Sequence, residues 1–329
     1  MNYEVIIATY NGGKYISEQI DSILNQTVLP SRIIIRDDNS SDNTLDLLNE
    51  YAINQTVQIE VISDGENLGY IKNFERLISY CNAEVVFFAD QDDIWKPNKA
   101  EQLLLLFNSR AGINVLFSDA ELFNNKHIIG GLWEYIGFNP YQEKLTVDRM
   151  LRNNVATGAT MAVKLSYIST ILPFPNHIPH DYWIAINAVI DNCIASCSLK
   201  LIRYRQHENN QIGAKKTSII EKIKNSTNLD KLKRRIKHHQ QQYAIAASLI
   251  RYDRLNATSP SIKSIHERLE MYNIIYNGLI FKSSNTAFDQ SLLKIFFSRN
   301  YLLDCKVKTI ITDIFDAILL RTIYRNINF

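Results

Sequence analysis

The chain has 329 residues, 46% of them hydrophobic, which is enough for one large or two medium domains with a buried core. Its 36 lysines and arginines nearly balance its 34 aspartates and glutamates, and the formal net charge is +2. The charges are unevenly divided, however: residues 1–214 carry 16 basic and 25 acidic side chains, and residues 215–329 carry 20 and 9. We therefore expect an acidic domain over 1–214 and a basic region over 215–329, each with different partners.

Cysteine usage and the N-terminal sequence favour a cytoplasmic protein. The four cysteines are too sparse for a disulfide framework, and Cys193 and Cys197 do not have the spacing of a CxxC motif. The first residues lack the basic and apolar segments of a signal peptide, and no apolar run is long enough to span a membrane. A peripheral position on the cytoplasmic face of the inner membrane is a further option.

Short β-branched runs alternate with helical patterns over the first 120 residues. Helices are predicted from residue 16 and at 44–51, 71–81, 97–108 and 181–190, and strands at 3–9, 32–36, 57–63, 84–89 and 114–118. This alternation is typical of βαβ units around a mostly parallel sheet. In such sheets, ligands bind beyond the carboxyl ends of the strands.

Three acidic residues, Asp90, Asp92 and Asp93, directly follow the predicted strand at 84–89. Carboxylates this close together repel one another, so a compensating cation is expected. Asp90 and Asp92 alternate on extended backbone, and their side chains would point the same way about 6.5 Å apart. Carboxylate oxygens suit Mg²⁺ or Mn²⁺. The alternative is a solvated loop in which Asp93 caps the following helix.

Two other predicted strand ends carry polar clusters, at Thr9-Tyr10-Asn11 and at Asp37-Asp38-Asn39. In a parallel sheet these clusters would converge with Asp90 and Asp92. Neither a GxGxxG motif nor a P-loop lysine motif follows the first strand, which argues against a dinucleotide-binding oxidoreductase or a P-loop NTPase. The pattern instead favours a nucleoside diphosphate held through a divalent ion.

In these features the chain resembles the inverting family 2 glycosyltransferases of GT-A fold, and most closely their bacterial rhamnosyltransferase-like branch. The matching motifs follow the family order over residues 3–213 and are Ala8-Thr9-Tyr10-Asn11-Gly12, Asp37-Asp38-Asn39-Ser40-Ser41-Asp42, Asn67-Leu68-Gly69-Tyr70 with Asn73, Phe88 to Trp95, Thr157-Gly158-Ala159-Thr160, His180-Asp181-Tyr182-Trp183 and Tyr204 to Asn210. The resemblance implies a GT-A-type α/β fold, a mostly parallel sheet flanked by helices, with a helical C-terminal extension.

The resemblance also implies residues for a nucleoside-diphosphate sugar donor. Asp38 would accept a hydrogen bond from N3–H of uracil or thymine, or would merely close its turn. Asn67 would meet the donor or serve as a left-handed turn residue. Asp90 would lie near the ribose or a metal-bound water, and Arg205 would neutralise phosphate. The remaining implied donor-binding residues are Thr9, Tyr10, Asn11, Asn73, Gln91, Thr157 and Gly158.

For the chemistry, the resemblance implies Asp181 as the catalytic base and Asp92 and His207 as ligands of Mn²⁺ or Mg²⁺. An inverting transfer needs one carboxylate that deprotonates the acceptor hydroxyl. Asp181 could instead be only a helix N-cap, and His207 only a satisfied polar residue. His180 would orient the base or touch the acceptor, and Trp183 fits a core position better than a sugar platform.

The implied function is metal-dependent transfer of a sugar, with L-rhamnose from dTDP-rhamnose as the leading donor, in O-antigen or capsule synthesis. The acceptor would be a glycan or a polyprenyl-linked glycan. Alternatives are a UDP-hexose or UDP-N-acetylhexosamine transferase of the same fold, or a non-catalytic module that binds nucleotide or glycan. A nucleotidyltransferase fits poorly, because Asn11-Gly12-Gly13 is not its phosphate loop.

The region 215–329 combines a basic cluster at 231–239 with an apolar helical stripe at 307–323. Basic amphipathic helices bind anionic membrane surfaces, so we expect such a surface as a partner. The stripe could instead pack in a core or in a homodimer interface. No nucleic-acid-binding motif is present, and no nucleic acid partner is expected.

Overall fold

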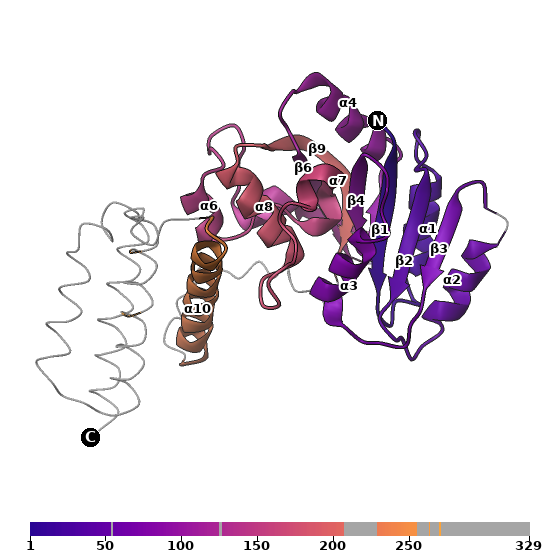
Figure 1. The fold of residues 1–329 in the computed structure, drawn as a ribbon, viewed down its shortest axis with the longest axis horizontal. Helices are drawn as coiled ribbons and strands as arrows, with labels where there is room; N and C mark the ends of the chain where they lie inside the picture. The colour runs from indigo at the N-terminus through magenta and orange to yellow at the C-terminus, as the bar shows by residue number, and fades with distance from the viewer. Residues whose placement is uncertain (54, 125–126, 207–228, 255–262, 264–269, 271–329) are drawn as a thin grey trace, which may run out of the picture. The chain divides into compact units, whose positions relative to one another are not determined.

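The computed structural model describes residues 1–53, 55–124, 127–206, 229–254, 263 and 270 (Figure 1). The chain divides into two compact units, Met1–Ala214 and Lys215–Phe329. The predicted metal ligand His207 and the predicted apolar stripe at 307–323 lie outside the described residues.

One nine-stranded sheet forms the centre of the first unit, in the order β3-β2-β1-β4-β8-β6-β9-β5, with β7 paired to β6. Strands β1 to β4 run parallel to one another, whereas β8 is antiparallel to both β4 and β6. The strands are β1 Tyr3–Thr9, β2 Arg32–Asp37, β3 Gln58–Ile62, β4 Val85–Ala89, β5 Ile94–Trp95, β6 Val115–Asn124, β7 His127–Gly131, β8 Met161–Lys164 and β9 Ile194–Arg205.

Helices flank this sheet, as Figure 1 shows. They are α1 Ile16–Leu24, α2 Thr44–Ala52, α3 Gly69–Ile78, α4 Lys99–Ser109, α5 Leu132–Ile136, α6 Val147–Arg152, α7 Leu165–Ile168 and α8 His180–Ile190, with a 3-10 turn, η1, at Gly158–Thr160. The predicted arrangement, a mostly parallel α/β sheet covered by helices, is confirmed.

The strands at the centre of the sheet are covered on both faces. Every residue of β4 is buried, and Val5, Ile6 and Ile7 of β1 are fully buried. Such continuous apolar runs are typical of parallel strands between two helical layers. Polar side chains follow these apolar runs, and the carboxyl ends of β1, β2 and β4 lie side by side.

Helical periodicity correctly identified most of the inward-facing side chains. Phe74, Leu77 and Ile78 of α3 are buried, as the apolar spacing predicts. On α2 the same spacing would also place Ala52 inward, but this residue is exposed. It is the last residue of the helix, and the inward face of α2 already ends at Leu48.

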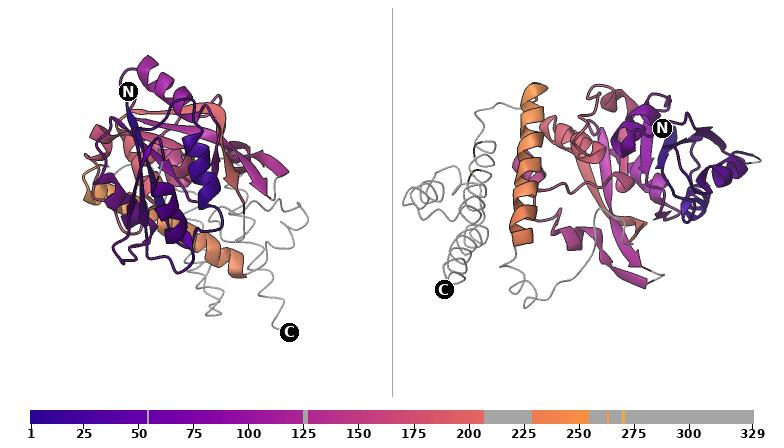
Figure 2. Two further views of the ribbon diagram at one scale, coloured as in Figure 1. Left: turned by 90° about the vertical axis from the view of Figure 1, so that its right-hand side faces the viewer. Right: turned by 90° about the horizontal axis from the view of Figure 1, so that it is seen from below.

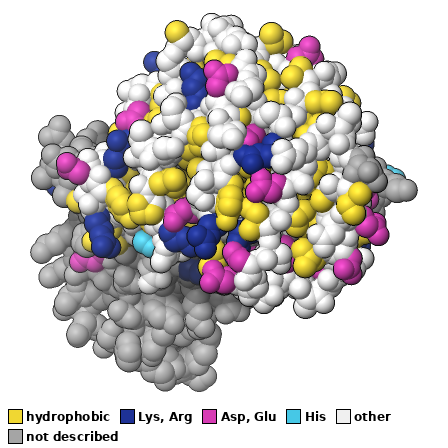
Figure 3. Space-filling view, turned by 45° about the vertical axis from the view of Figure 1, so that its right-hand side comes forward, with side chains coloured by type: hydrophobic (Ala, Val, Ile, Leu, Met, Phe, Trp, Pro, Cys, Tyr) yellow, Lys and Arg dark blue, Asp and Glu magenta, His cyan; other side chains and the backbone are white. Residues whose placement is uncertain are grey.

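In the second unit the structure describes one long helix, α10, over Leu229–Arg251 (Figure 2). The predicted basic cluster at 231–239 falls within it, and Lys237 and His238 are exposed. Among the described residues, no helix is both long and apolar enough to cross a membrane. On the face drawn in Figure 3, basic and acidic side chains are interspersed among apolar ones.

Candidate active site

A cavity of about 1040 Å³ lies beyond the carboxyl ends of β1, β2 and β4. The structure places all three predicted polar clusters on its wall, although they are far apart in the sequence. From the clusters and from later segments, the predicted residues on the wall are Thr9, Tyr10, Asn11, Asp38, Asn67, Asn73, Asp90, Gln91, Asp92, Thr157, Gly158 and Asp181.

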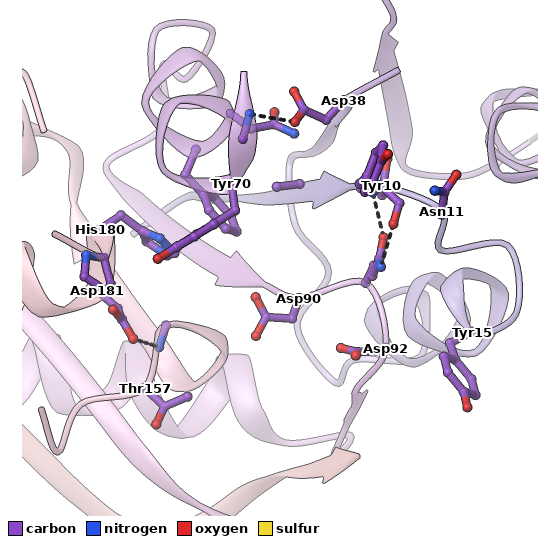
Figure 4. Close-up of a pocket in the computed structure, with 18 of the residues that line it drawn as sticks. Tyr10, Asn11, Tyr15, Asp38, Tyr70, Asp90, Asp92, Thr157, His180 and Asp181 are labelled. Carbon is purple, nitrogen blue, oxygen red and sulfur yellow. Dashed lines mark hydrogen bonds between the residues drawn. The ribbon is translucent and has the colours of Figure 1, made fainter. Parts of the chain in front are cut away.

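The end of β1 presents one aromatic ring to the cavity. Tyr10 is 51% exposed, and Figure 4 shows its side chain at the edge of the cavity. Thr9 is buried instead, and its hydroxyl donates to Asp37 Oδ1 at 2.9 Å. Asn11 adopts a left-handed backbone with φ of 50°, and its Oδ1 accepts the backbone N–H of Ser41 at 2.8 Å. Tyr10 is therefore the residue of this cluster that can pack beside a planar base.

Asp38 is held by three hydrogen-bond donors of the protein. Its Oδ1 accepts from Arg36 Nη1 and from the backbone N–H of Leu68, both at 2.8 Å, and its Oδ2 accepts the backbone N–H of Gly69 at 2.8 Å. One lone pair of Oδ2 remains for a ligand. The turn after β2 is closed by the neighbouring Asp37, whose carboxylate accepts a backbone N–H at 2.7 Å, so the prediction of a mere turn role for Asp38 is wrong.

The two predicted asparagines brace the same corner. Asn67 Nδ2 donates to the backbone carbonyl of Asp38 at 2.9 Å. The left-handed residue of this turn is Gly69, with φ of 73°, so the alternative prediction for Asn67 is wrong. Asn73 is 1% exposed and donates to the carbonyl of Arg36 at 3.2 Å, while its Oδ1 has no partner among the described residues.

The loop after β4 brings Asp90 and Asp92 to the cavity (Figure 4). Burial, together with the nearby carboxylates of Asp92 and Asp181, raises the pKa of Asp90 to about 7, against the lowering effect of Lys99. Gln91, between the two acids, turns its amide to the backbone of Tyr10, which it contacts at 2.9 and 3.1 Å.

Asp93 and Arg205 brace this loop from behind. Asp93 is buried, and its Oδ1 accepts the backbone N–H of Arg205 at 2.9 Å. Residue Asn98, not Asp93, occupies the N-cap of α4, so the capping prediction is wrong. Arg205 Nε donates to the carbonyl of Asp92 at 2.7 Å, and its Nη2 to Glu18 at 2.8 Å. Arg205 is absent from the cavity wall, which corrects its predicted contact with phosphate.

Asp181 reaches the cavity from the first turn of α8. Its carboxylate accepts the backbone N–H groups of Gly158 at 3.1 Å and Tyr182 at 2.6 Å. Burial nevertheless raises the pKa of Asp181 to about 6, since the loss of solvation outweighs these hydrogen bonds. The N-cap of α8 is Pro179, so the prediction of a capping role alone is wrong.

His180 is a neutral ring in an aromatic setting. It is buried, with its ring centroid 4.1 Å from that of Phe74 and 5.4 Å from that of Phe88, and neither ring nitrogen has a partner among the described residues. Burial lowers the pKa of His180 to about 3. A Cβ on Gly158 would lie 2.9 Å from His180 Nε2, which explains the glycine there. Trp183 is 1% exposed and belongs to the core, as predicted.

Three functional candidates escaped the sequence reasoning. Lys14 and Tyr204 line the cavity, and Lys99 lies fully buried beneath it. Lys99 Nζ donates to the carbonyl of Ala159 at 2.7 Å and lies 3.6 Å from the centroid of the Trp95 ring. Burial lowers the pKa of Lys99 well below its usual range, while the nearby acids oppose that shift. Strand alternation could have identified Tyr204. Adjacent residues on a strand face opposite sides, so Tyr204 and Arg205 cannot both face the cavity.

The carboxylate oxygens in the cavity suit a hard divalent cation, and a bound ligand would supply the rest of the coordination of that cation. Within the described ranges, no group of three or more histidine, cysteine or acidic side chains is arranged to hold a metal. Asp90 and Asp92 nevertheless both face the cavity. Mg²⁺ is commonly bound by one or two carboxylates together with phosphate oxygens of a substrate. The two aspartates could therefore hold such an ion jointly with a diphosphate.

Comparison with known proteins places this geometry in a family. The model of "Glycosyl transferase family 2" matches residues 4–169. A dTDP-rhamnosyl transferase, RfbG, of Shigella flexneri is 29% identical over 236 residues, covering 63% of this chain and 74% of the relative. A beta-1,3-glucosyltransferase, WfgD, of Escherichia coli is 26% identical over 203 residues, covering 61% and 76%.

The fold is shared with solved glycosyltransferase structures. TarS 1–349 of S. aureus in complex with UDP superposes with a TM-score of 0.58 at 16% identity, covering all of this chain and 93% of that one. The mannosyltransferase PcManGT of Pyrobaculum calidifontis, in complex with GDP-Man and Mn²⁺, gives 0.53 at 13% identity and covers 97% and 86%. These likenesses confirm the predicted fold class. Since the family model spans about half of the chain, the chain belongs to glycosyl transferase family 2 and is a glycosyltransferase.

Proposed function

We propose that the chain transfers a sugar, with inversion, from a dTDP- or UDP-linked donor to a glycan or polyprenyl-linked glycan in bacterial surface polysaccharide synthesis. The observation that carries this proposal is the placement of Asp38, Asp90, Asp92 and Asp181 around one cavity. The names of the relatives add support, since one is a dTDP-rhamnosyl transferase and another uses UDP-Glc and a diphosphoundecaprenol-linked acceptor. We take dTDP-rhamnose as the first donor to test and UDP-hexoses and UDP-N-acetylhexosamines as the alternatives.

The corner formed by Tyr10 and Asp38 would bind the nucleobase. The free lone pair on Asp38 Oδ2 can accept one hydrogen bond, which suits the N3–H of uracil or thymine. The aromatic ring of Tyr10 offers a face on which the base can pack. Because Arg36, Leu68 and Gly69 already fix the carboxylate, Asp38 needs no reorganisation when the base arrives.

The donor diphosphate would then extend toward Asp90 and Asp92. Mg²⁺ or Mn²⁺, held by these two side chains, would supply positive charge to the leaving nucleoside diphosphate. Gln91 keeps the two carboxylates in place through its contacts with the backbone of Tyr10. The contribution of His207 to the metal remains a prediction, since that residue lies outside the described part of the chain.

Asp181 would act as the general base. Its carboxylate takes the proton of an acceptor hydroxyl as the hydroxyl oxygen bonds to the anomeric carbon and the bond from that carbon to the diphosphate oxygen breaks. The Gly158 N–H fixes the orientation of the carboxylate. A carboxylate whose pKa is raised to about 6 is deprotonated at neutral pH and is also a better proton acceptor than an ordinary aspartate.

We assign nucleotide-sugar binding and catalysis to residues 1–214 and attachment to an anionic membrane surface to residues 215–329. The basic cluster within α10 motivates the second assignment. This would place the enzyme in the cytoplasm, at the inner face of the membrane. Binding to vesicles that contain phosphatidylglycerol, but not to vesicles of phosphatidylcholine alone, would support it. A homodimer held by the same region would instead appear as doubled mass in light scattering.

The test is a transfer assay with Mn²⁺ and a panel of dTDP- and UDP-sugars, preceded by a thermal-shift screen for the donor that binds. Wild type should release nucleoside diphosphate and form a product of inverted configuration. Asp181→Asn should still bind the donor but lose transfer by at least about a hundredfold. Full activity in Asp181→Asn would remove it as the base. Nucleotide binding without turnover in wild type would favour the non-catalytic binding module.

A further inference from the structure

The cavity wall is strongly acidic for a site that would bind a diphosphate. Four carboxylates line it, those of Asp38, Asp90, Asp92 and Asp181. The diphosphate of a nucleotide sugar brings about two more negative charges at neutral pH. Arg36 pairs with Asp38, and one divalent cation offsets only part of the remaining charge, so a side-chain cation beside the phosphates would stabilise them.

Three of the nearby cations are already committed to the protein. Arg36 is fully buried and binds Asp38 at 2.8 Å and Asp64 at 2.6 Å. Lys99 is fully buried with its ammonium against the Trp95 ring. Arg205 lies between the rings of Tyr15 and Phe123, 4.4 and 4.6 Å from their centroids, and lies off the cavity wall. None of the three presents its charge to a ligand.

Lys14 is different. Among the residues that the structure describes, it is the one lysine or arginine on the cavity wall, and it is exposed. It follows Gly12 and Gly13, whose backbone N–H groups donate to Thr44 Oγ1 at 2.8 Å and to Asp42 Oδ2 at 3.1 Å. The backbone beside Lys14 is thus pinned, while its side chain extends into solvent at the cavity.

The position of Lys14 is at the Asp92 end of the cavity. Its Nζ lies 4.9 Å from the centroid of the Tyr15 ring, and that ring packs on Arg205, which bonds the carbonyl of Asp92. Figure 4 shows Tyr15 and Asp92 at the same edge. Because Asp92 is the expected partner of the metal and the diphosphate, the lysine ammonium can reach the same phosphate oxygens.

We infer that Lys14 binds the diphosphate of the sugar donor and stabilises the nucleoside diphosphate as it leaves, the role predicted for Arg205. This inference rests on the proposed nucleotide-sugar donor. A lysine ammonium on a four-carbon stem suits the task, because it is a compact charge that can follow the phosphate as the glycosidic bond breaks. Its hydrogen bonds to phosphate oxygens are charge-assisted and therefore stronger than neutral ones.

The test compares Lys14→Met, which keeps the length of the side chain, with Lys14→Arg, which keeps the charge. Lys144→Met, at an exposed lysine away from the cavity wall, is the matched control. Calorimetry with dTDP and UDP, and with thymidine and uridine, separates phosphate from base recognition. Lys14→Met should weaken the binding of dTDP and UDP about tenfold and leave the affinity for thymidine and uridine within twofold of wild type. It should also flatten the salt dependence of diphosphate binding. Lys14→Arg should recover most of the affinity.

Each outcome separates this inference from the proposed function. If wild type binds the diphosphates and Lys14→Met binds them equally well, Lys14 has no role in phosphate recognition. Equal weakening of nucleosides and diphosphates would also overturn the inference, since it would show a disturbed loop and not a lost charge. If wild type binds no diphosphate at all, the proposed donor class is wrong, and the inference about Lys14 is wrong as well.

Discussion

The amide of Gln91 ties the metal-binding loop to the end of β1, and this contact can be broken from either side. Gln91 Oε1 accepts the backbone N–H of Tyr10 at 2.9 Å, and its Nε2 donates to the Tyr10 carbonyl at 3.1 Å. A Cβ added at Gly12 would lie 2.3 Å from Gln91 Oε1 and 2.7 Å from its Cδ. Gly12→Ala must therefore expel the amide and break both hydrogen bonds.

The expected cost follows from those two bonds. Each is worth about 0.5–1.5 kcal/mol net, and Gln91 is partly exposed, so water can replace some of what is lost. We expect Gly12→Ala and Gln91→Ala each to lower the free energy of unfolding by about 1–2 kcal/mol. The double variant should lose little more than either single one, because both substitutions remove the same contact.

Urea denaturation of the four proteins at 25 °C measures this coupling, which should be about 1 kcal/mol. Gly12→Ala combined with Asn43→Ala is the control, since the Asn43 side chain adjoins Gly13 and is not among the nearest neighbours of Gly12. That pair should be additive within about 0.5 kcal/mol. Additivity in the Gly12 and Gln91 pair as well would show that the hydrogen bonds of Gln91 to Tyr10 do not hold this loop in place. It would also refute our account of why Asp90 and Asp92 face the cavity.

Four further predictions concern buried charged groups. Arg36→Met should lower the free energy of unfolding by about 3 kcal/mol in urea, because it leaves the carboxylate of Asp38 buried without its cation. Lys99→Met should cost about 1–3 kcal/mol in the same assay through the lost bond to Ala159. Transfer activity should fall as the pH drops below about 6, where Asp181 becomes protonated. Since the folded pKa of Asp181 lies above its unfolded value, wild type loses stability as the pH rises from about 4 to 6, and Asp181→Asn should be the more stable protein at pH 8 but not at pH 4.

The sequence was sufficient to predict the parallel half of the sheet, because local sequence patterns determine that half. Strands β1, β2 and β4 each contain a continuous apolar run that is followed by polar residues. The pairing of β6 with β9 was not predictable in the same way. Val115 pairs with Ile194, which lies 79 residues further along the chain, and exposed residues at 198–200 and at Arg203 interrupt the apolar pattern of β9. Neither feature is a local signal, so the second half of the sheet required the structure.

The cations were the weakest part of the sequence prediction, since their roles depend on packing. Lysines on amphipathic helices are usually exposed, yet Lys99 is fully buried under the acidic loop. Arg205 was expected on the phosphates, but its neighbour Tyr204 faces the cavity. Residues adjacent on a strand point to opposite faces, so a strand that presents Tyr204 to the cavity turns Arg205 away.

Neighbouring acids also have different tasks. Asp37 closes a turn, whereas Asp38 faces the cavity. Asp92 faces the cavity, whereas Asp93 is buried and holds the backbone of Arg205. In each pair one carboxylate bonds to the backbone and fixes the conformation of the loop. That conformation keeps the other carboxylate directed toward the cavity. In both pairs one aspartate is structural and the other faces the cavity, but the cavity-facing residue is the second of the pair after β2 and the first after β4, although the two strands run in the same direction.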